Sequence, residues 1–237
     1  MNSLQLHDIQ LNYGSLMEIG DRLGFLSSFN GEGHKEFSSF LQHSINKKTF
    51  LDIGCSYGAF GLAFTKRDST AKAYCFDGSM NAWLALNQTI ELNELTNIKC
   101  HRLLMGDVDG LVGVAYDQHQ SLVNANSNLS DLMMQVDTFC ELFNVVPDCM
   151  KIDTEGCEFK ILQGAIDTIK QHAPILFMEV HPNFLKFHGN TIYNVLDLFN
   201  DINYIALDLD GNEIADYKTV LEEEKTDSHR SVWVPKT

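Results

Sequence analysis

The sequence predicts an α/β fold built on a mostly parallel sheet. From residue 49 onward, short apolar segments of strand length alternate with longer segments that have a helical pattern. This alternation is typical of a parallel sheet covered by helices on both faces. The first apolar segment passes through two glycines into a helix, as the first βα unit of a nucleotide-binding sheet does. The length of 237 residues suits one globular domain with a core of ordinary size.

Each element of the expected sheet follows from the position of an apolar segment. The predicted parallel strands cover residues 49–54, 71–77, 98–105, 149–153 and 174–181. The predicted helices cover residues 58–66, 79–93, 158–172 and 190–200. Two terminal strands are expected at 204–209 and 231–235, joined by a solvated connection at 221–225, and short extra strands at 111–116 and 133–136. A polar loop is expected at 124–130.

The first 48 residues carry no motif that we can match. We expect them to be helical in part, with a helix at 34–43, where Phe37, Phe40 and Leu41 have helical spacing. We therefore divide the chain into an N-terminal helical cap or lead-in at residues 1–48 and a main domain at residues 49–237.

Charge and cysteine content limit the partners and the compartment. The net charge is −15 and no cluster of Lys or Arg offsets it, so the average surface repels nucleic acid. A small or neutral substrate fits better. The six cysteines form no Cys-x-x-Cys pair, and we expect buried, reduced thiols in a reducing cytoplasm. We expect no signal peptide and no membrane-spanning segment, and the oligomeric state stays open.

The turn after the first strand contains the most specific pattern. Asp52, Gly54 and Gly58 form the pattern Asp-x-Gly-x-x-x-Gly, which differs from the Gly-x-Gly-x-x-Gly pattern of dinucleotide-binding proteins. An acid at the strand end suits a ligand with a cationic group, such as the amino group of S-adenosylmethionine (SAM). An NAD-dependent dehydrogenase is the alternative that this difference argues against.

Acids also follow the next two predicted strands. Asp77 ends the second strand and could accept two hydrogen bonds from ribose hydroxyls, or it could cap the following helix. Ser79 is placed to N-cap that helix. Asp107 follows the third strand and could accept from an adenine amino group, or it could be an ordinary turn aspartate. Three acids at three successive strand ends indicate one ligand site.

A second group of polar residues follows the fourth and fifth strands. Lys151 and Asp153 share one face of a strand, and Glu155 lies in the turn after it. Glu179 and His181 share one face of the next strand. If these two strands are neighbours, all five side chains converge. Glu158 begins a helix, where an acid complements the dipole.

These motifs resemble the FkbM family of SAM-dependent methyltransferases from about residue 49 to 235. The most specific match is Val136-Asp-Thr-Phe-Cys, followed by Lys151-Ile-Asp-Thr-Glu-Gly and Glu158-Phe-Lys-Ile-Leu-Gln-Gly-Ala. The residues Cys55-Ser-Tyr and Gly78-Ser-Met depart from the usual family pattern, and these departures bear more on the inference about the substrate than on the inference about the cofactor. The resemblance implies a class I, Rossmann-like three-layer sandwich with a seven-stranded, mostly parallel sheet and an antiparallel terminal strand.

The resemblance also implies SAM as cofactor and methyl transfer to a hydroxyl of a small molecule such as a sugar or natural product. A catalytically inactive SAM-binding sensor or scaffold is the alternative. It implies that Asp52, Gly54 and Gly58 hold the methionine end of SAM. The full set that we assign to cofactor binding is Asp52, Gly54, Cys55, Gly58, Asp77, Gly78, Ser79, Gly106, Asp107 and Asp153.

The candidate catalytic residues are those of the second polar group. His181 is the leading general base by its intrinsic pKa, with Glu179, Glu155 and Asp153 as the other candidates. Lys151 would steady the acids or polarise the acceptor. The same acids and histidine could instead hold a divalent metal, which we weigh as the competing and less favoured interpretation.

Overall fold

The computed structural model describes residues 2–6, 9–16, 32–116, 121–123, 127–223 and 228–236. They belong to two compact units. The first contains Met1–Leu104 and Gly110–Met133, and the second contains Met105–Asp109 and Met134–Thr237. Each unit is described by itself.

A seven-stranded sheet has the strand order β12-β13-β11-β10-β3-β4-β5. In the first unit, β3 (Thr49–Ile53), β4 (Lys72–Asp77) and β5 (Ile98–Arg102) are parallel. In the second unit, β10 (Cys149–Ile152) and β11 (Ile175–Val180) are parallel, and β13 (His229–Pro235) is antiparallel to both β11 and β12 (Tyr204–Leu207). The predicted fold class, a mostly parallel sheet with an antiparallel terminal strand, is therefore confirmed.

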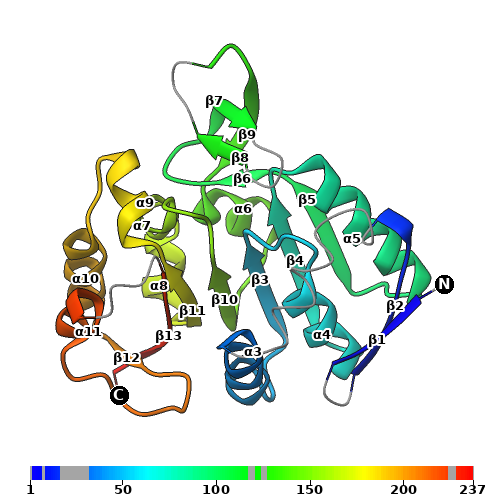
Figure 1. Ribbon diagram of the computed structural model, residues 1–237, viewed down its shortest axis with the longest axis horizontal. Coiled ribbons are helices and arrows are strands. Elements are labelled where there is room, and N and C mark those ends of the chain that lie inside the picture. Colours follow the sequence, from blue (N-terminus) through cyan, green and yellow to red (C-terminus); the bar gives the residue numbers. More distant parts are fainter. Residues whose placement is uncertain are drawn as a thin grey trace. The chain divides into compact units, whose positions relative to one another are not determined.

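Helices of the first unit pack on its strands through apolar residues. Helix α4 (Ala59–Arg67) contacts β3 and β4, and α5 (Met80–Leu92) contacts β5 (Figure 1). Helix α3 (Glu32–His43), at the position predicted for 34–43, packs on α4. A chain of aromatic contacts joins these elements, because the ring of Phe40 lies 4.9 Å from that of Phe50 and 5.1 Å from that of Phe60. Burial of these rings gives α3 a fixed position against the strands.

The N-terminus contains a β-hairpin that the sequence interpretation missed. Strands β1 (Asn2–Leu6) and β2 (Ile9–Tyr13) pair antiparallel, where a partly helical segment was expected. Strand β2 contacts helix α5, and the side chain of Asn93 bonds the backbone of Asn12 in both directions, at 2.9 and 2.7 Å. Ile9 and Leu11 are buried, so the hairpin belongs to the core of the first unit.

The segment after β5 differs from the predicted single strand at 98–105. Strand β5 ends at Arg102 and the short β6 (Leu104–Met105) follows. Strand β7 (Gly110–Tyr116) pairs antiparallel with β8 (Ser121–Val123) and with β9 (Ser130–Met134). The strand predicted at 133–136 is wrong at its end, because Val136 begins helix α6 (Val136–Phe143). Part of the predicted polar loop, residues 124–126, lies outside the described residues.

In the second unit, the single helix predicted at 158–172 is two helices, α7 (Glu158–Gln163) and α8 (Ile166–His172). The break lies at Gly164, whose position would place a Cβ 1.9 Å from the carbonyl oxygen of Gly106. Helices α9 (Pro182–Leu185) and α10 (Ile192–Asp201) follow β11. Helix α11 (Tyr217–Glu223) occupies the start of the expected solvated connection, and residues 224–227 lie outside the described part.

Two further findings concern the whole described chain. All six cysteines are described and none is in a disulfide, in line with the expected reduced thiols. Cys55, Cys75, Cys140 and Cys149 are buried, whereas Cys100 and Cys157 are partly exposed. Within the described residues, every helix is too short or too polar to cross a membrane.

Candidate active site

The turn after β3 has the backbone that its glycines predict. Gly54 has a φ of 75° and Gly58 a φ of 74°, a region that other residues adopt only at a cost. The backbone N–H groups of Gly54 and Cys55 both donate to the carbonyl of Phe76, at 2.9 and 3.0 Å. The turn is therefore held against the end of β4.

Asp52 lies beneath this turn. Its side chain is buried, with 1% of the residue exposed, and its Oδ2 accepts a hydrogen bond of 3.2 Å from the backbone of Gly61 in helix α4. Cys55 is also buried, and burial raises the pKa of its thiol well above the ordinary value. The contacts seen for both residues are with the protein itself, so their roles toward the cofactor stay predictions.

Asp77 links the turn after β3 to the turn that precedes α5. One carboxylate oxygen accepts from the backbone N–H of Ser56 and the other from that of Ser79, each at 2.8 Å. The Ser79 hydroxyl accepts from the backbone N–H of Ala82 at 3.3 Å, so the predicted N-cap of α5 is confirmed. The N-cap of α5 is Ser79, so Asp77 holds the two turns through their backbone N–H groups and does not cap the helix itself. Its contact with ribose, like the roles assigned to Gly78 and Ser79, stays a prediction.

Gly106 and Asp107 belong to the second unit. The backbone N–H of Gly106 donates to the carbonyl of Met134 at 3.2 Å, and the carboxylate of Asp107 lies 3.7 Å from the ammonium of Lys160. Asp107 is partly exposed and lies in the turn after β6. Asp107 belongs to the second unit and Asp52 and Asp77 to the first, so the sharing of one ligand by the three acids stays a prediction.

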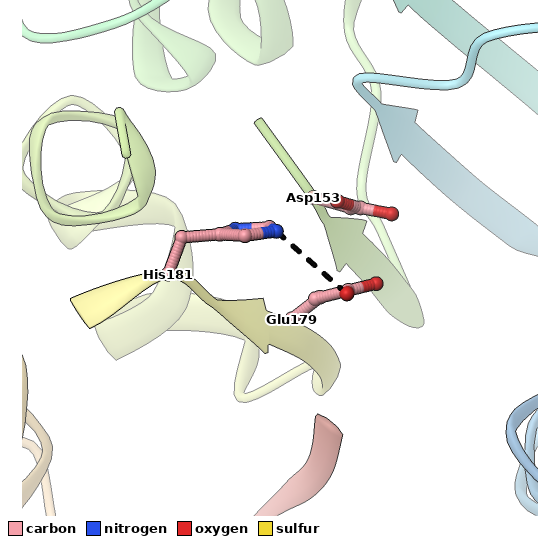
Figure 2. A group of neighbouring side chains, drawn as sticks. All are labelled: Asp153, Glu179 and His181. Carbon is pink, nitrogen blue, oxygen red and sulfur yellow. Dashed lines mark ion pairs between the residues drawn. The ribbon is translucent and has the colours of Figure 1, made fainter. Parts of the chain in front are cut away.

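The polar residues of β10 and β11 do converge. The two strands are adjacent and parallel, with Lys151 in register with Phe177. The Lys151 ammonium donates to Asp153 Oδ2 at 2.7 Å. Figure 2 shows the side chains of Asp153, Glu179 and His181 close to one another, and their donor atoms all lie within 4.8 Å of one another. We call Lys151, Asp153, Glu155, Glu158, Glu179, His181 and Arg230 the acid–histidine cluster.

His181 lies at the centre of this cluster and is 4% exposed. Its Nδ1 is 2.7 Å from Glu158 Oε1, a hydrogen-bonding distance. Its Nε2 lies 3.6 Å from Glu155 Oε2 and 3.7 Å from Glu179 Oε1. The imidazole therefore has one tightly bonded nitrogen and one that faces two carboxylates.

The sequence interpretation missed three partners in this cluster. Glu158, which the sequence assigned to the helix dipole, is fully buried and also accepts from the backbone N–H of Gly156 at 3.0 Å. Arg230 Nη2 lies 2.7 Å from Glu179 Oε1, and the hydroxyl of Ser228 donates to the same oxygen at 2.6 Å. Arg230 is opposite Glu179 in the β11–β13 pairing, a register that the sequence pattern alone did not give.

The charges of the cluster shift the pKa values of its members. Burial lowers the pKa of His181, but the hydrogen bond and charge of Glu158, with Asp153 and Glu155, outweigh it and raise the pKa to about 9. Burial raises the pKa of Asp153, yet the charge and hydrogen bond of Lys151 hold it below the ordinary value. Burial raises the pKa of Glu155. A raised pKa favours the protonated imidazole near pH 7, whereas a general base must be neutral, so the role of His181 as base stays a prediction.

Comparisons with known proteins agree with this fold. The FkbM methyltransferase domain model matches residues 84–206, and a methyltransferase small domain model matches residues 32–118. A comparison with curated proteins found no match. The structure of a TehB-like SAM-dependent methyltransferase from Corynebacterium glutamicum is 12% identical, with a TM-score of 0.51, and the match covers 94% of this chain and 98% of that one. At this identity, the likeness shows the fold alone.

A solved FkbM methyltransferase from Methylobacillus flagellatus is 15% identical, with a TM-score of 0.49. The match covers 79% of this chain but only 43% of that one, so this chain spans less than half the length of that protein. The family itself is shown by the domain model, whose match covers more than half of the 237 residues. The chain therefore belongs to the FkbM family of methyltransferases.

Proposed function

We propose that this methyltransferase transfers the methyl group of SAM to a hydroxyl oxygen of a small molecule. The observation that carries the proposal is the acid–histidine cluster at the ends of β10 and β11, because ligands of open α/β sheets bind beyond the carboxyl ends of the strands. SAM is the methyl donor that the family implies. A sensor or scaffold that only binds SAM would have little use for so many ionisable groups in this place.

The acceptor class follows from the charge. A net charge of −15 disfavours nucleic acid, because affinity for a polyanion depends on Lys and Arg that neutralise phosphates. A neutral hydroxylated molecule, such as a sugar or another natural product, carries no such penalty. We propose this class of acceptor.

Glu155 is the base that we favour. Of the acids in the cluster it has the most accessible side chain, 35% exposed, compared with 27% for Asp153 and 7% for Glu179. A base must reach the proton that it removes, so accessibility favours Glu155. In the transfer, the oxygen–hydrogen bond breaks and its proton passes to Glu155, while the carbon–sulfur bond of SAM breaks and a carbon–oxygen bond forms.

The test separates binding from transfer. Wild type is titrated with SAM by calorimetry and is then incubated with labelled SAM and a panel of sugars and phenolic or aliphatic natural products. General-base catalysis contributes roughly 10²–10⁴-fold, so Glu155→Gln should lose activity by about that factor and keep its SAM affinity. Asp197→Asn, at an exposed acid of α10, serves as control.

Three results would count against the proposal. SAM binding without label transfer to any acceptor would favour the sensor or scaffold. A thermal shift with NAD but none with SAM would favour a dehydrogenase. Retention of RNA or DNA in a gel-shift assay, weakened by added salt, would overturn the acceptor class.

A further inference from the structure

We propose that Asp153, Glu179 and His181 bind one divalent metal ion of the Mg²⁺ or Mn²⁺ class. The three residues lie at neighbouring strand ends of the second unit, with their side chains close together (Figure 2). Two carboxylates and one imidazole are ligands that such an ion accepts in proteins. From the sequence alone, a metal site was the less favoured interpretation of these residues, and general-base catalysis was the favoured one.

The spacing of the donor atoms fits an ion better than direct hydrogen bonds. His181 Nε2 and Glu179 Oε1 are 3.7 Å apart, which is too long for a hydrogen bond. Ligand atoms around an octahedral ion at about 2.1 Å lie roughly 3.0 to 4.2 Å apart. All three donors lie within 4.8 Å of one another, so small side-chain movements would complete the site.

The surroundings also have the form of a metal site, because each proposed ligand has an outer partner. Glu158 bonds His181 Nδ1 at 2.7 Å, which leaves Nε2 to face the other two ligands. Lys151 bonds Asp153, and Arg230 and Ser228 bond Glu179. Histidine ligands of metals commonly donate their second nitrogen to a carboxylate, and ligating carboxylates are themselves hydrogen-bonded.

The charges provide an independent reason. Asp153, Glu155, Glu158 and Glu179 are four carboxylates, and Lys151 and Arg230 are two permanent cations, so two negative charges remain when His181 is neutral. A divalent ion would balance them. Glu158 is fully buried and its Oε2 has no hydrogen-bond partner within the described part of the chain. Burying a carboxylate is costly unless it is paired, and Glu158 is paired with His181 Nδ1 at 2.7 Å.

The role of the ion rests on the proposed function, whereas its binding does not. An acceptor oxygen bound to a divalent ion loses its proton more readily, because the ion stabilises the resulting anion. Glu155 would then receive the proton.

The test measures metal binding without SAM or acceptor. The full chain is freed of metal with a chelator, and Mn²⁺ is added while the signal of the free ion is followed by electron paramagnetic resonance. We expect one Mn²⁺ per chain, competed by Mg²⁺. Asp153→Asn and Glu179→Gln should weaken binding at least tenfold, and Glu158→Gln, which changes an outer partner, by roughly 10- to 100-fold. Asp197→Asn should bind like wild type.

Two outcomes would overturn the proposal. The first is folded wild type that takes up no Mn²⁺ at millimolar concentration, a measurement that needs no variant to fold. The second is equal Mn²⁺ affinity in wild type, Asp153→Asn and Glu179→Gln, with folding checked by circular dichroism. Calorimetry with SAM and the assay with labelled SAM, on the same samples, separate the metal site from the proposed function. Mn²⁺ binding without methyl transfer would refute the proposed function but not the metal site.

Discussion

The imidazole Nδ1 of His181 lies 2.7 Å from Oε1 of Glu158, and both side chains are almost completely buried. The residues are 23 positions apart, so the contact joins the start of α7 to the residue after β11. Glu158 fixes the direction of the ring, because a carboxylate accepts a hydrogen bond only from a nitrogen that carries a proton. The opposite nitrogen is therefore directed at Glu155 and Glu179.

This contact predicts an effect on stability. Glu158→Ala removes one partner of a buried pair and leaves His181 without its carboxylate, a change that costs about 3–5 kcal/mol in comparable sites. Glu158→Gln keeps an oxygen that can accept from Nδ1, so its free energy of unfolding should fall much less. Urea unfolding of both variants beside wild type measures the difference. Equal losses would show that packing, and not the hydrogen bond, decides the effect.

Much of the fold was predictable, because the strands of the sheet are apolar segments bounded by glycines and acids. The end of β4 at Asp77 was predicted at the right residue, as was the N-cap at Ser79, since both depend on neighbours in the sequence. The convergence of Lys151, Asp153 and His181 was also predicted, on the condition that the fourth and fifth strands are neighbours. Local pattern is sufficient where the interacting residues are close in sequence or lie at equivalent strand ends.

What could not be predicted depends on long-range contacts. Glu158 has the sequence appearance of an ordinary first-turn acid, and only the folded chain brings it to His181. Helix α6 was missed and only its first residue, Val136, was assigned to a strand, because nothing local shows that the Asp137 carboxylate accepts from the backbone of Asp167 and Thr168 at the start of α8. The register of Arg230 against Glu179 likewise requires knowledge of the β11–β13 pairing.

Asp77 provides a test of the cofactor site. Asp77→Ala should weaken SAM binding, because it removes an acceptor for ribose and also releases the two backbone N–H groups that the carboxylate holds. A hydrogen bond to a charged group is worth about 1.5–3 kcal/mol, which is tenfold or more in affinity. Titration calorimetry with SAM measures the change. Glu91→Gln, an exposed acid on α5, is the control, and unchanged affinity in Asp77→Ala would remove Asp77 from the site.

A substitution at Gly164 can disturb the loop at Gly106 while the residues of that loop stay unchanged. Gly164→Ala places a methyl group 1.9 Å from the Gly106 carbonyl oxygen, so backbone must move. Overpacking of this kind costs about 1–3 kcal/mol. If the loop at Gly106 and Asp107 holds the adenine, this variant should also bind SAM more weakly.

Gly211→Ala is the matched control for this variant. Gly211 has a φ of 89° and open space around its Cα, so the alanine strains the backbone by about 1–2 kcal/mol without a clash. Thermal unfolding should show a loss in both variants, whereas only Gly164→Ala should lose SAM affinity. Equal SAM affinity in the two variants would argue against a role of this loop in adenine binding.

His101 predicts how stability depends on pH. Its ring stacks on Phe76 with centroids 5.3 Å apart, and burial, with a smaller contribution from the charge of Lys99, lowers the pKa of the imidazole. The unfolded chain, with a histidine pKa of about 6.5, then binds a proton more readily than the folded chain. The stabilising contribution of neutral His101 is therefore complete above about pH 6.5 and is lost as the pH falls through and below that value. His101→Phe keeps a stacked ring without a titrating group, so its stability should decrease less than that of wild type between pH 8 and pH 5 in urea titrations. Parallel pH profiles for the two proteins would show that His101 does not titrate differently on folding.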